Sequence, residues 1–164
     1  MTKLFAFCFV ACLLFSVSVS TAQDIASFEG TWKIDIAKSD FGSDPPPKSL
    51  IVTVSKVPPE SLSVHTSGVD ASGKSFSHSW VGPMDGSLHP FEGEDVKQSI
   101  RKDGNTLIRH GEIPDGSTFD ARDTLSADGN TVTEEMTMKS KDGKEEKGKT
   151  VMHRVTRNEK KPGA

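Results

Sequence analysis

The chain has 164 residues and a formal net charge of −3 at neutral pH, with 26% charged residues. Neither sign of charge clusters, so the sequence lacks the basic stripe of a nucleic-acid-binding protein, and we expect no nucleic-acid partner. Both cysteines, Cys8 and Cys12, lie near the N-terminus. The sequence after them therefore has neither a disulfide nor a thiolate nucleophile.

Residues 1–22 have the three-part pattern of an export signal. Lys3 gives a positive start, residues 4–15 are almost wholly apolar, and Ser20-Thr21-Ala22 places small residues where a signal peptidase recognises them. The apolar run is shorter than the roughly 20 residues of a transmembrane helix. We therefore expect cleavage after Ala22, a periplasmic or secreted mature protein and no stable membrane anchor.

The first strand is predicted over residues 28–35, where Gly30, Trp32 and Ile34 share one face. Such alternation with a period of two recurs along the sequence and is typical of strands with one buried side. The following stretch, residues 36–48, is predicted to be a connector. It has room for one helical turn over 37–41 that stops at Gly42, and a run of three prolines prevents any continuation.

The remaining sequence predicts a succession of short strands joined by tight turns. Strands are expected over residues 49–57, 62–66, 74–80, 95–102, 105–112, 117–126, 130–140 and 147–156, with a short one near 87–88. Asp-Gly pairs end four of the turns, and this dipeptide supplies the positive φ angles that a tight hairpin needs. The sequence therefore predicts an all-β fold, a single up-and-down antiparallel β-barrel of about 8–10 strands, because closure removes exposed sheet edges.

The predicted barrel domain spans residues 23–156, which suits one domain. The charged stretch over 157–164 is interpreted as a disordered tail. We expect the protein to be a monomer.

The run Gly30-Thr31-Trp32-Lys33 resembles the first-strand signature of the calycins, the superfamily of lipocalins and fatty-acid-binding proteins. Residues 30–49 and 150–155 resemble exported bacterial lipocalin-like proteins. The resemblance implies that Trp32 closes one end of the barrel and that Arg154 on the last strand packs across its ring. A cation over an indole face contributes about 0.5–2 kcal/mol, so this pair has a structural role.

Other parts of the sequence depart from those families. The carboxylate-binding Arg-x-Tyr of many fatty-acid-binding proteins aligns with Thr150 and Met152, and the chain has no tyrosine. The connector over 36–48 is too short for their helical lid, so the resemblance does not imply fatty-acid specificity. Apolarity alone would turn Val151 and Val155 inward on the last strand, whereas the alignment turns Met152 and Arg154 inward.

Side chains that share one face of a predicted strand form several stripes, and these are candidates to line an internal cavity. They are Phe76, His78, Trp80, Ile100, Leu107, Arg109, Phe119, Met136, Met138 and Met152. An inward Arg109 is costly unless it is paired or faces an anionic ligand. The alternative is that the stripes interdigitate as a filled core, with Arg109 outward and Ile108 inward.

The sequence contains no motif for catalysis or metal binding. Its five histidines lack zinc spacing, no Gly-x-Ser-x-Gly elbow is present, and we expect neither a metal nor a cofactor. Neighbours on a strand point to opposite faces, so the pairs Glu134-Glu135 and Glu145-Glu146 are interpreted as solvated charges flanking hairpins.

Three functions remain open from the sequence. The first is the binding of a small apolar or amphipathic ligand without transforming it. The second is a structural or interaction module with a filled core, which predicts a large exposed apolar patch. The third, an enzyme, requires an inward pair of polar groups such as His78 with Asp123.

Overall fold

The computed structural model describes residues 28–58 and 60–155, which form ten antiparallel strands and one turn of 3-10 helix. The strands are β1 (Gly30–Ile34), β2 (Ser49–Val57), β3 (Ser61–Val69), β4 (Ser75–Pro83), β5 (His89–Pro90), β6 (Lys97–Asp103), β7 (Thr106–Glu112), β8 (Thr118–Leu125), β9 (Thr131–Lys139) and β10 (Glu145–Arg154). The predicted export signal and the predicted tail lie outside the described residues.

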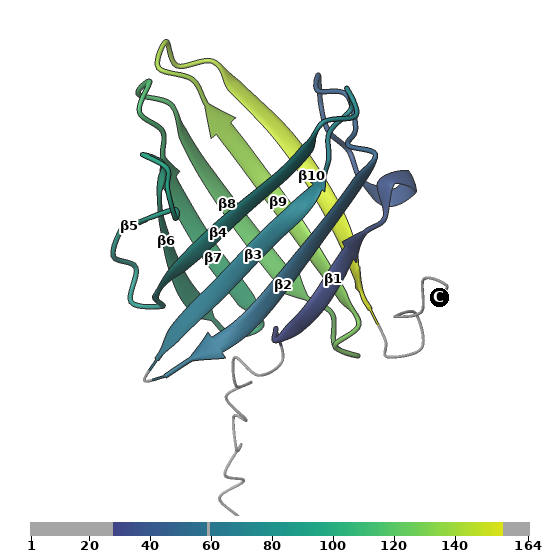
Figure 1. Ribbon diagram of the computed structural model, residues 1–164, viewed down its shortest axis with the longest axis vertical. Helices are drawn as coiled ribbons and strands as arrows, with labels where there is room; N and C mark the ends of the chain where they lie inside the picture. Colours follow the sequence, from purple (N-terminus) through teal and green to yellow (C-terminus); the bar gives the residue numbers. More distant parts are fainter. Residues whose placement is uncertain (1–27, 59, 156–164) are drawn as a thin grey trace, which may run out of the picture.

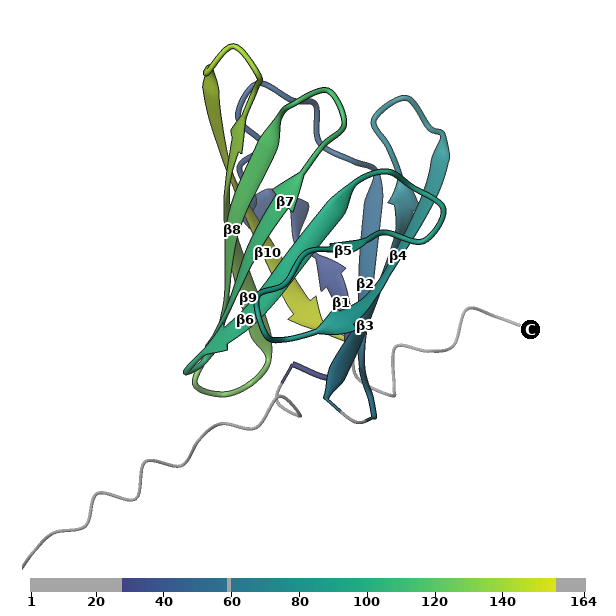
Figure 2. The same cartoon turned by 90° about the vertical axis from the view of Figure 1, so that its left-hand side faces the viewer.

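All ten strands belong to one sheet in the order β4-β3-β2-β1-β10-β9-β8-β7-β6-β5. Consecutive strands pair with each other, and β1 pairs with both β2 and β10. Figure 1 shows β2 to β4 crossing in front of β6 to β9, and Figure 2 shows the two walls facing each other across the barrel. The sheet therefore wraps around one interior, as the up-and-down topology predicted.

The barrel nearly closes where β4 approaches β5. Trp80 and Phe91 form an isolated bridge across this seam, and the Glu92 amide donates to the Ser79 carbonyl at 2.8 Å. The Trp80 indole N–H donates to the carbonyl of His89 at 3.1 Å. The prediction of an all-β, antiparallel barrel is confirmed.

The Asp-Gly turns adopt the backbone that the sequence predicted. Their glycines have φ angles of 60°, 90°, 70° and 88° at Gly104, Gly116, Gly129 and Gly143. Two local predictions are shifted. The helical turn is η2 (Ile36–Lys38) rather than 37–41, because the residue after it, Ser39, already has extended backbone. The short strand is β5, two residues later than predicted.

The last strand turns Met152 and Arg154 inward, as the calycin alignment implied. Met152 belongs to the hydrophobic core cluster. Val151 on the opposite face is also buried, with 7% exposure, because the connector covers it. Its amide donates to the Ser39 hydroxyl at 2.9 Å, and its carbonyl accepts from the Asp35 amide at 2.8 Å.

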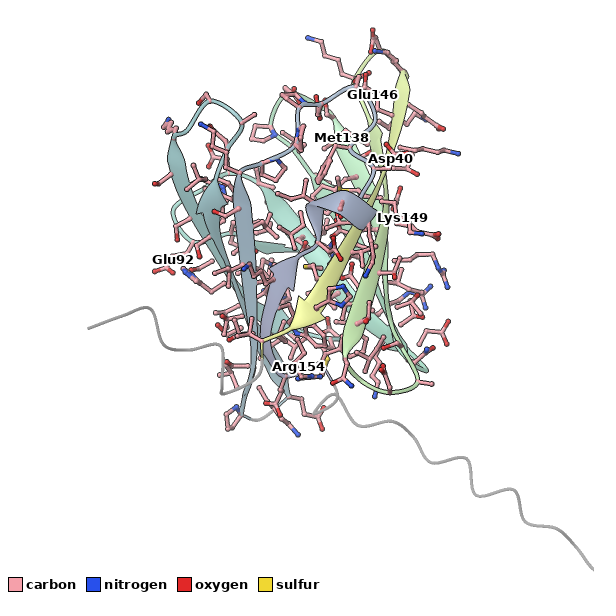
Figure 3. All side chains as sticks on the ribbon, turned by 90° about the vertical axis from the view of Figure 1, so that its right-hand side faces the viewer. Asp40, Glu92, Met138, Glu146, Lys149 and Arg154 are labelled. Atoms are coloured by element: carbon pink, nitrogen blue, oxygen red, sulfur yellow. The ribbon has the colours of Figure 1, made fainter. Side chains whose placement is uncertain are left out.

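One end of the barrel is closed by Trp32 and Arg154. The guanidinium carbon of Arg154 lies 4.2 Å from the Trp32 ring centroid, and Trp32 is almost fully buried. Arg154 also donates from Nη1 to the Glu29 carbonyl at 2.6 Å and from Nε to the Gly129 carbonyl at 2.9 Å. Figure 3 shows Arg154 at this end and Met138 and Glu146 toward the other. The predicted pair is confirmed.

Candidate functional site

A cavity of about 220 Å³ lies inside the barrel next to the closed end. Its walls are Phe28, Trp32, Leu50, Val52, Val54, Val64, Thr66, Phe91, Gln98, Ile100, Leu107, Arg109, Asp123, Val132, Glu134, Thr150 and Met152. A single water needs only about 10–15 Å³ of such volume, so this space is large enough for a small organic molecule. The alternative of a completely filled core is therefore wrong for this part of the barrel.

The cavity has two chemically different sides. The side formed by β1, β2 and β3 is apolar except for Thr66, and Trp32 and Phe28 contribute at the closed end. The polar side chains are concentrated on β6 to β10, the opposite wall in Figure 2. An interior with an apolar wall and a few convergent polar groups is typical of small-molecule sites.

Arg109 is the centre of the polar side. Its Nε donates to Asp123 Oδ2 at 2.8 Å and its Nη2 to Asp123 Oδ1 at 3.1 Å, a bidentate ion pair. Nη2 also donates to Glu134, and Nη1 donates to Gln98 Oε1 at 3.2 Å. The side chains of Arg109, Asp123 and Glu134 are 19%, 12% and 18% exposed. We call Arg109, Asp123, Glu134 and Gln98 the Arg109 cluster.

The strand register explains why these side chains meet. Asp123 and Glu134 are paired directly across β8 and β9, and Ala121 faces Arg109 across β7 and β8. Small Ala121 leaves room for the Arg109 side chain to extend diagonally toward Asp123. The ion pairs of the cluster thereby offset the cost of turning a charged arginine inward. They meet the condition stated from the sequence, that an inward Arg109 must be paired or face an anionic ligand.

Burial and mutual charge shift the pKa values within the cluster. Burial raises the pKa of Asp123 to about 6; the charge of Arg109 opposes this rise, and the charge of Glu134 adds to it. Burial alone would lower the pKa of Arg109, but the charges of Asp123 and Glu134 raise it above its ordinary value. Arg109 is therefore permanently cationic, and the two carboxylates share one cation.

Four of the predicted lining residues reach the cavity: Ile100, Leu107, Arg109 and Met152. Three aromatic ones, Phe76, Trp80 and Phe119, also face inward but do not line it. Each ring lies against a glycine on the barrel wall, so that a Cβ built at Gly68, Gly82 or Gly111 would meet it at 2.9, 2.5 or 1.9 Å respectively. The absence of a side chain at each glycine leaves room for these rings against the wall.

The other three predicted residues, His78, Met136 and Met138, lie outside the cavity walls. Met138 pairs with Glu146 near the end of the barrel opposite Arg154 (Figure 3). His78 contacts Glu94, with Nδ1 2.5 Å from Oε1. Their part in ligand binding stays a prediction.

The catalytic pair considered from the sequence does not form in the described part of the chain. The hydrogen-bond partner of His78 is Glu94, whereas Asp123 is held by Arg109.

The interpretation of Glu134 as a solvated charge is wrong. It faces the interior and contacts Arg109, while its neighbour Glu135 is exposed. Strand parity contained the signal, because Glu134 lies two residues before Met136, which the sequence analysis placed among the candidate lining residues. By the same alternation, Asp123 lies on the inward face of β8 together with Phe119. Gln98 was missed too, although it lies two residues before Ile100.

A second concavity lies along β7 to β10, and its lining includes the predicted residues Arg109 and Met136. It has a volume of about 550 Å³, and its walls include the outward side chains of Asp120, Arg122, Glu135, Lys147 and Lys149. Charges of both signs alternate on it, which is typical of a solvated sheet face.

Among the described residues, no group of three or more His, Cys, Asp or Glu side chains could hold a metal ion. No helix within residues 28–58 and 60–155 is long and apolar enough to cross a membrane.

Comparison with solved structures shows which fold this is. The fluorescent protein UnaG superposes with a TM-score of 0.56 at 14% identity, over 80% of this chain and 99% of that protein. The REP1-NXSQ fatty acid transporter superposes with a TM-score of 0.52 at 14% identity, over 80% and 98%. Secretory abundant heat soluble protein 4 from Ramazzottius varieornatus gives 0.51 at 18% identity, over 79% and 96%.

The chain has the same antiparallel β-barrel fold as these three proteins. The predicted resemblance is thus confirmed for the fold, which is what a likeness at these identities shows. No protein-family model and no curated protein sequence matches the chain.

Proposed function

We propose that this calycin-type barrel binds a small apolar or amphipathic molecule in its interior and does not transform it. The observation that carries the proposal is the 220 Å³ cavity, which has an apolar wall, a closed end and one polar side. Structurally similar barrels include a fatty acid transporter and the protein EF1p2_mFAP2b bound to DFHBI, the latter with a TM-score of 0.51 at 13% identity over 83% of this chain. These similarities support a binding role.

The size of the cavity limits the ligand. An engineered cavity of about 150 Å³ in another protein binds benzene, whereas drug-sized ligands occupy pockets of about 300–1,000 Å³. The ligand should therefore be comparable to one aromatic ring with a short substituent, or to a short alkyl chain. A long-chain lipid would require the walls to move.

The interaction-module alternative lacks the surface that it predicts. The large hydrophobic side chains exposed in the described part of the chain are Ile36, Ile51, Val81 and Leu88. They lie on η2, on β2, on β4 and in the turn before β5, and so on four separate segments. Single exposed apolar residues of this kind are normal on a monomer.

Filling the cavity tests the binding proposal. Val64→Phe places a ring into the cavity from β3, whereas Val81→Phe makes the same change on the outer face of β4, where Val81 is 52% exposed. Native mass spectrometry of protein purified from its own source should show a retained small molecule in the wild type and in Val81→Phe. Val64→Phe should lose it. Equal retention in both variants would contradict binding in this cavity.

We also propose that the protein is exported as a monomer after removal of residues 1–22. The leader pattern described from the sequence supports export. The mass of the protein recovered from the periplasm or the medium, and its native mass, test the cleavage site after Ala22 and the oligomeric state together.

A further inference from the structure

We propose that the polar side of the cavity selects a ligand with a cationic or neutral hydrogen-bond-donating head group and disfavours a carboxylate. This inference rests on the binding function proposed above and specifies the chemical class of its ligand. It follows from how the Arg109 cluster is already paired, and from its net charge.

The guanidinium of Arg109 is largely occupied. Arginine has five N–H donors in a planar fork, and this fork is what recognises a carboxylate with two parallel hydrogen bonds. In Arg109 one edge of the fork, Nε and Nη2, is bonded to both oxygens of Asp123, and Nη2 also contacts Glu134. Nη1 donates to Gln98. To form two parallel hydrogen bonds with Arg109, an incoming carboxylate would have to displace one of the protein's own carboxylates.

The net charge of the cluster also favours a cationic ligand over a carboxylate. One arginine faces two carboxylates, so the cluster carries one net negative charge when both are ionised. Among the described residues that line the cavity, no other side chain is charged. The three groups are mostly buried, so water screens their charges less than at the surface. A ligand cation is therefore attracted to this side of the cavity, and a ligand anion is repelled.

The neutral lining adds sites for an uncharged head group. Thr150 faces Glu134 across β9 and β10, and Thr66 contributes a hydroxyl from the opposite wall. An alcohol or amide can donate to the carboxylates and accept from these hydroxyls. We therefore expect the affinity for neutral polar ligands to lie between the affinities for cations and for anions.

The preference should weaken in acid. The charged groups that face Asp123 are Arg109 from β7 and Glu134 from β9. Burial raises the pKa of Asp123 to about 6, so protonation near that pH removes the excess negative charge while Arg109 stays cationic. The advantage of an amine over a carboxylate should decrease as the pH falls through 6.

Three probes with one hydrocarbon chain and different head groups test the inference: 1-hexylamine, 1-hexanol and hexanoate. Binding to the full-length mature protein is followed by NMR of ¹³C-methyl methionine, because Met152 lines the cavity and Met138 does not. At neutral pH we expect the amine to bind at least about tenfold more tightly than hexanoate, with hexanol between them.

A pair of variants assigns the effect to the cluster. Glu134→Gln removes a negative charge inside the barrel, and Glu135→Gln removes one from the adjacent outward position. Glu134→Gln should reduce the amine-to-carboxylate affinity ratio at least about fivefold, whereas Glu135→Gln should leave it within about twofold.

The possible outcomes separate the two proposals. If none of the probes shifts the Met152 signal, binding in this cavity is wrong, and this inference falls with it. If the probes bind but hexanoate equals or exceeds the amine, only the inference about the head group is overturned. Equal effects of the two glutamine variants would likewise overturn it, because the selectivity would then come from the overall charge.

Discussion

Arg154 stacks on Trp32 with its guanidinium carbon 4.2 Å from the ring centroid, and the two residues pair directly across β1 and β10. This contact joins the first strand to the last and closes one end of the barrel. The Trp32 indole N–H donates to the Phe28 carbonyl at 3.0 Å, which holds the ring in place. The floor of the cavity is therefore built from both ends of the described chain.

Replacing Arg154 should destabilise the whole barrel. Arg154→Ala removes the cation from the Trp32 ring and the hydrogen bonds to the Glu29 and Gly129 carbonyls. We expect the free energy of unfolding to fall by about 2–4 kcal/mol, measured by urea denaturation. The control Arg122→Ala, on the exposed face of β8, should change it by at most about 0.5 kcal/mol. Equal effects would refute the structural role of the pair.

The contact between Gly111 and Phe119 predicts a second loss of stability. A Cβ at Gly111 would lie 1.9 Å from the Phe119 ring, whereas one at Gly148 on β10 would lie 3.3 Å from its nearest neighbour, the Asp40 carbonyl oxygen. Gly111→Ala should therefore reduce the free energy of unfolding by about 1–3 kcal/mol, because the ring must leave the wall. The thermal midpoint should fall accordingly. Gly148→Ala should cost clearly less. A benign Gly111→Ala would show that Phe119 can move without cost.

Stability should depend on pH through Asp123. Its folded-state pKa of about 6 exceeds the ordinary value of 3.8, so between these values the folded protein keeps a proton that the unfolded chain releases. The stability that this group contributes is complete below about pH 4 and is lost as the pH rises through 6, on the order of 2 kcal/mol. Other acids with lowered pKa values act in the opposite direction, so variants must be compared.

Glu134→Gln isolates this effect. Without the charge of Glu134, Arg109 faces Asp123 alone and the pKa of Asp123 should fall. The loss of stability between pH 4 and 7 should then shrink by on the order of 1 kcal/mol relative to the wild type, as measured by urea denaturation at each pH. Glu135→Gln, with the same change of charge outside, should follow the wild-type profile. An unchanged profile in Glu134→Gln would contradict the coupling.

Ser39 should matter for attaching the connector to β10. Its hydroxyl donates to the Asp35 carbonyl at 2.8 Å and accepts from the Val151 amide at 2.9 Å. Ser39→Ala leaves that amide without its partner and should cost about 1–2 kcal/mol, with faster hydrogen exchange at Val151. Ser55→Ala, at an exposed position on β2, is the matched control and should be close to neutral. Unchanged exchange at Val151 would disprove the role.

Part of the candidate site could be predicted from the sequence, and the wrong predictions have specific causes. Strand parity placed Ile100 and Leu107 on the cavity wall, and the calycin alignment placed Met152 there. Glu134 was misread because its charge was given more weight than its parity, and a buried carboxylate becomes acceptable only when a cation is in reach. Phe119 was placed on the correct face, but its ring folds onto Gly111 instead of into the cavity.

The resemblance to the calycins implied the Trp32–Arg154 closure, and the sequence by itself determined the strands and the turns. These depend on neighbours along the chain, since alternation has a period of two and Asp-Gly supplies the positive φ of a hairpin. Only the tertiary structure decided that a void remains beside Trp32 and that Arg109 is neutralised by Asp123 and Glu134. Packing and charge pairing depend on side-chain directions across several strands, which no local pattern encodes.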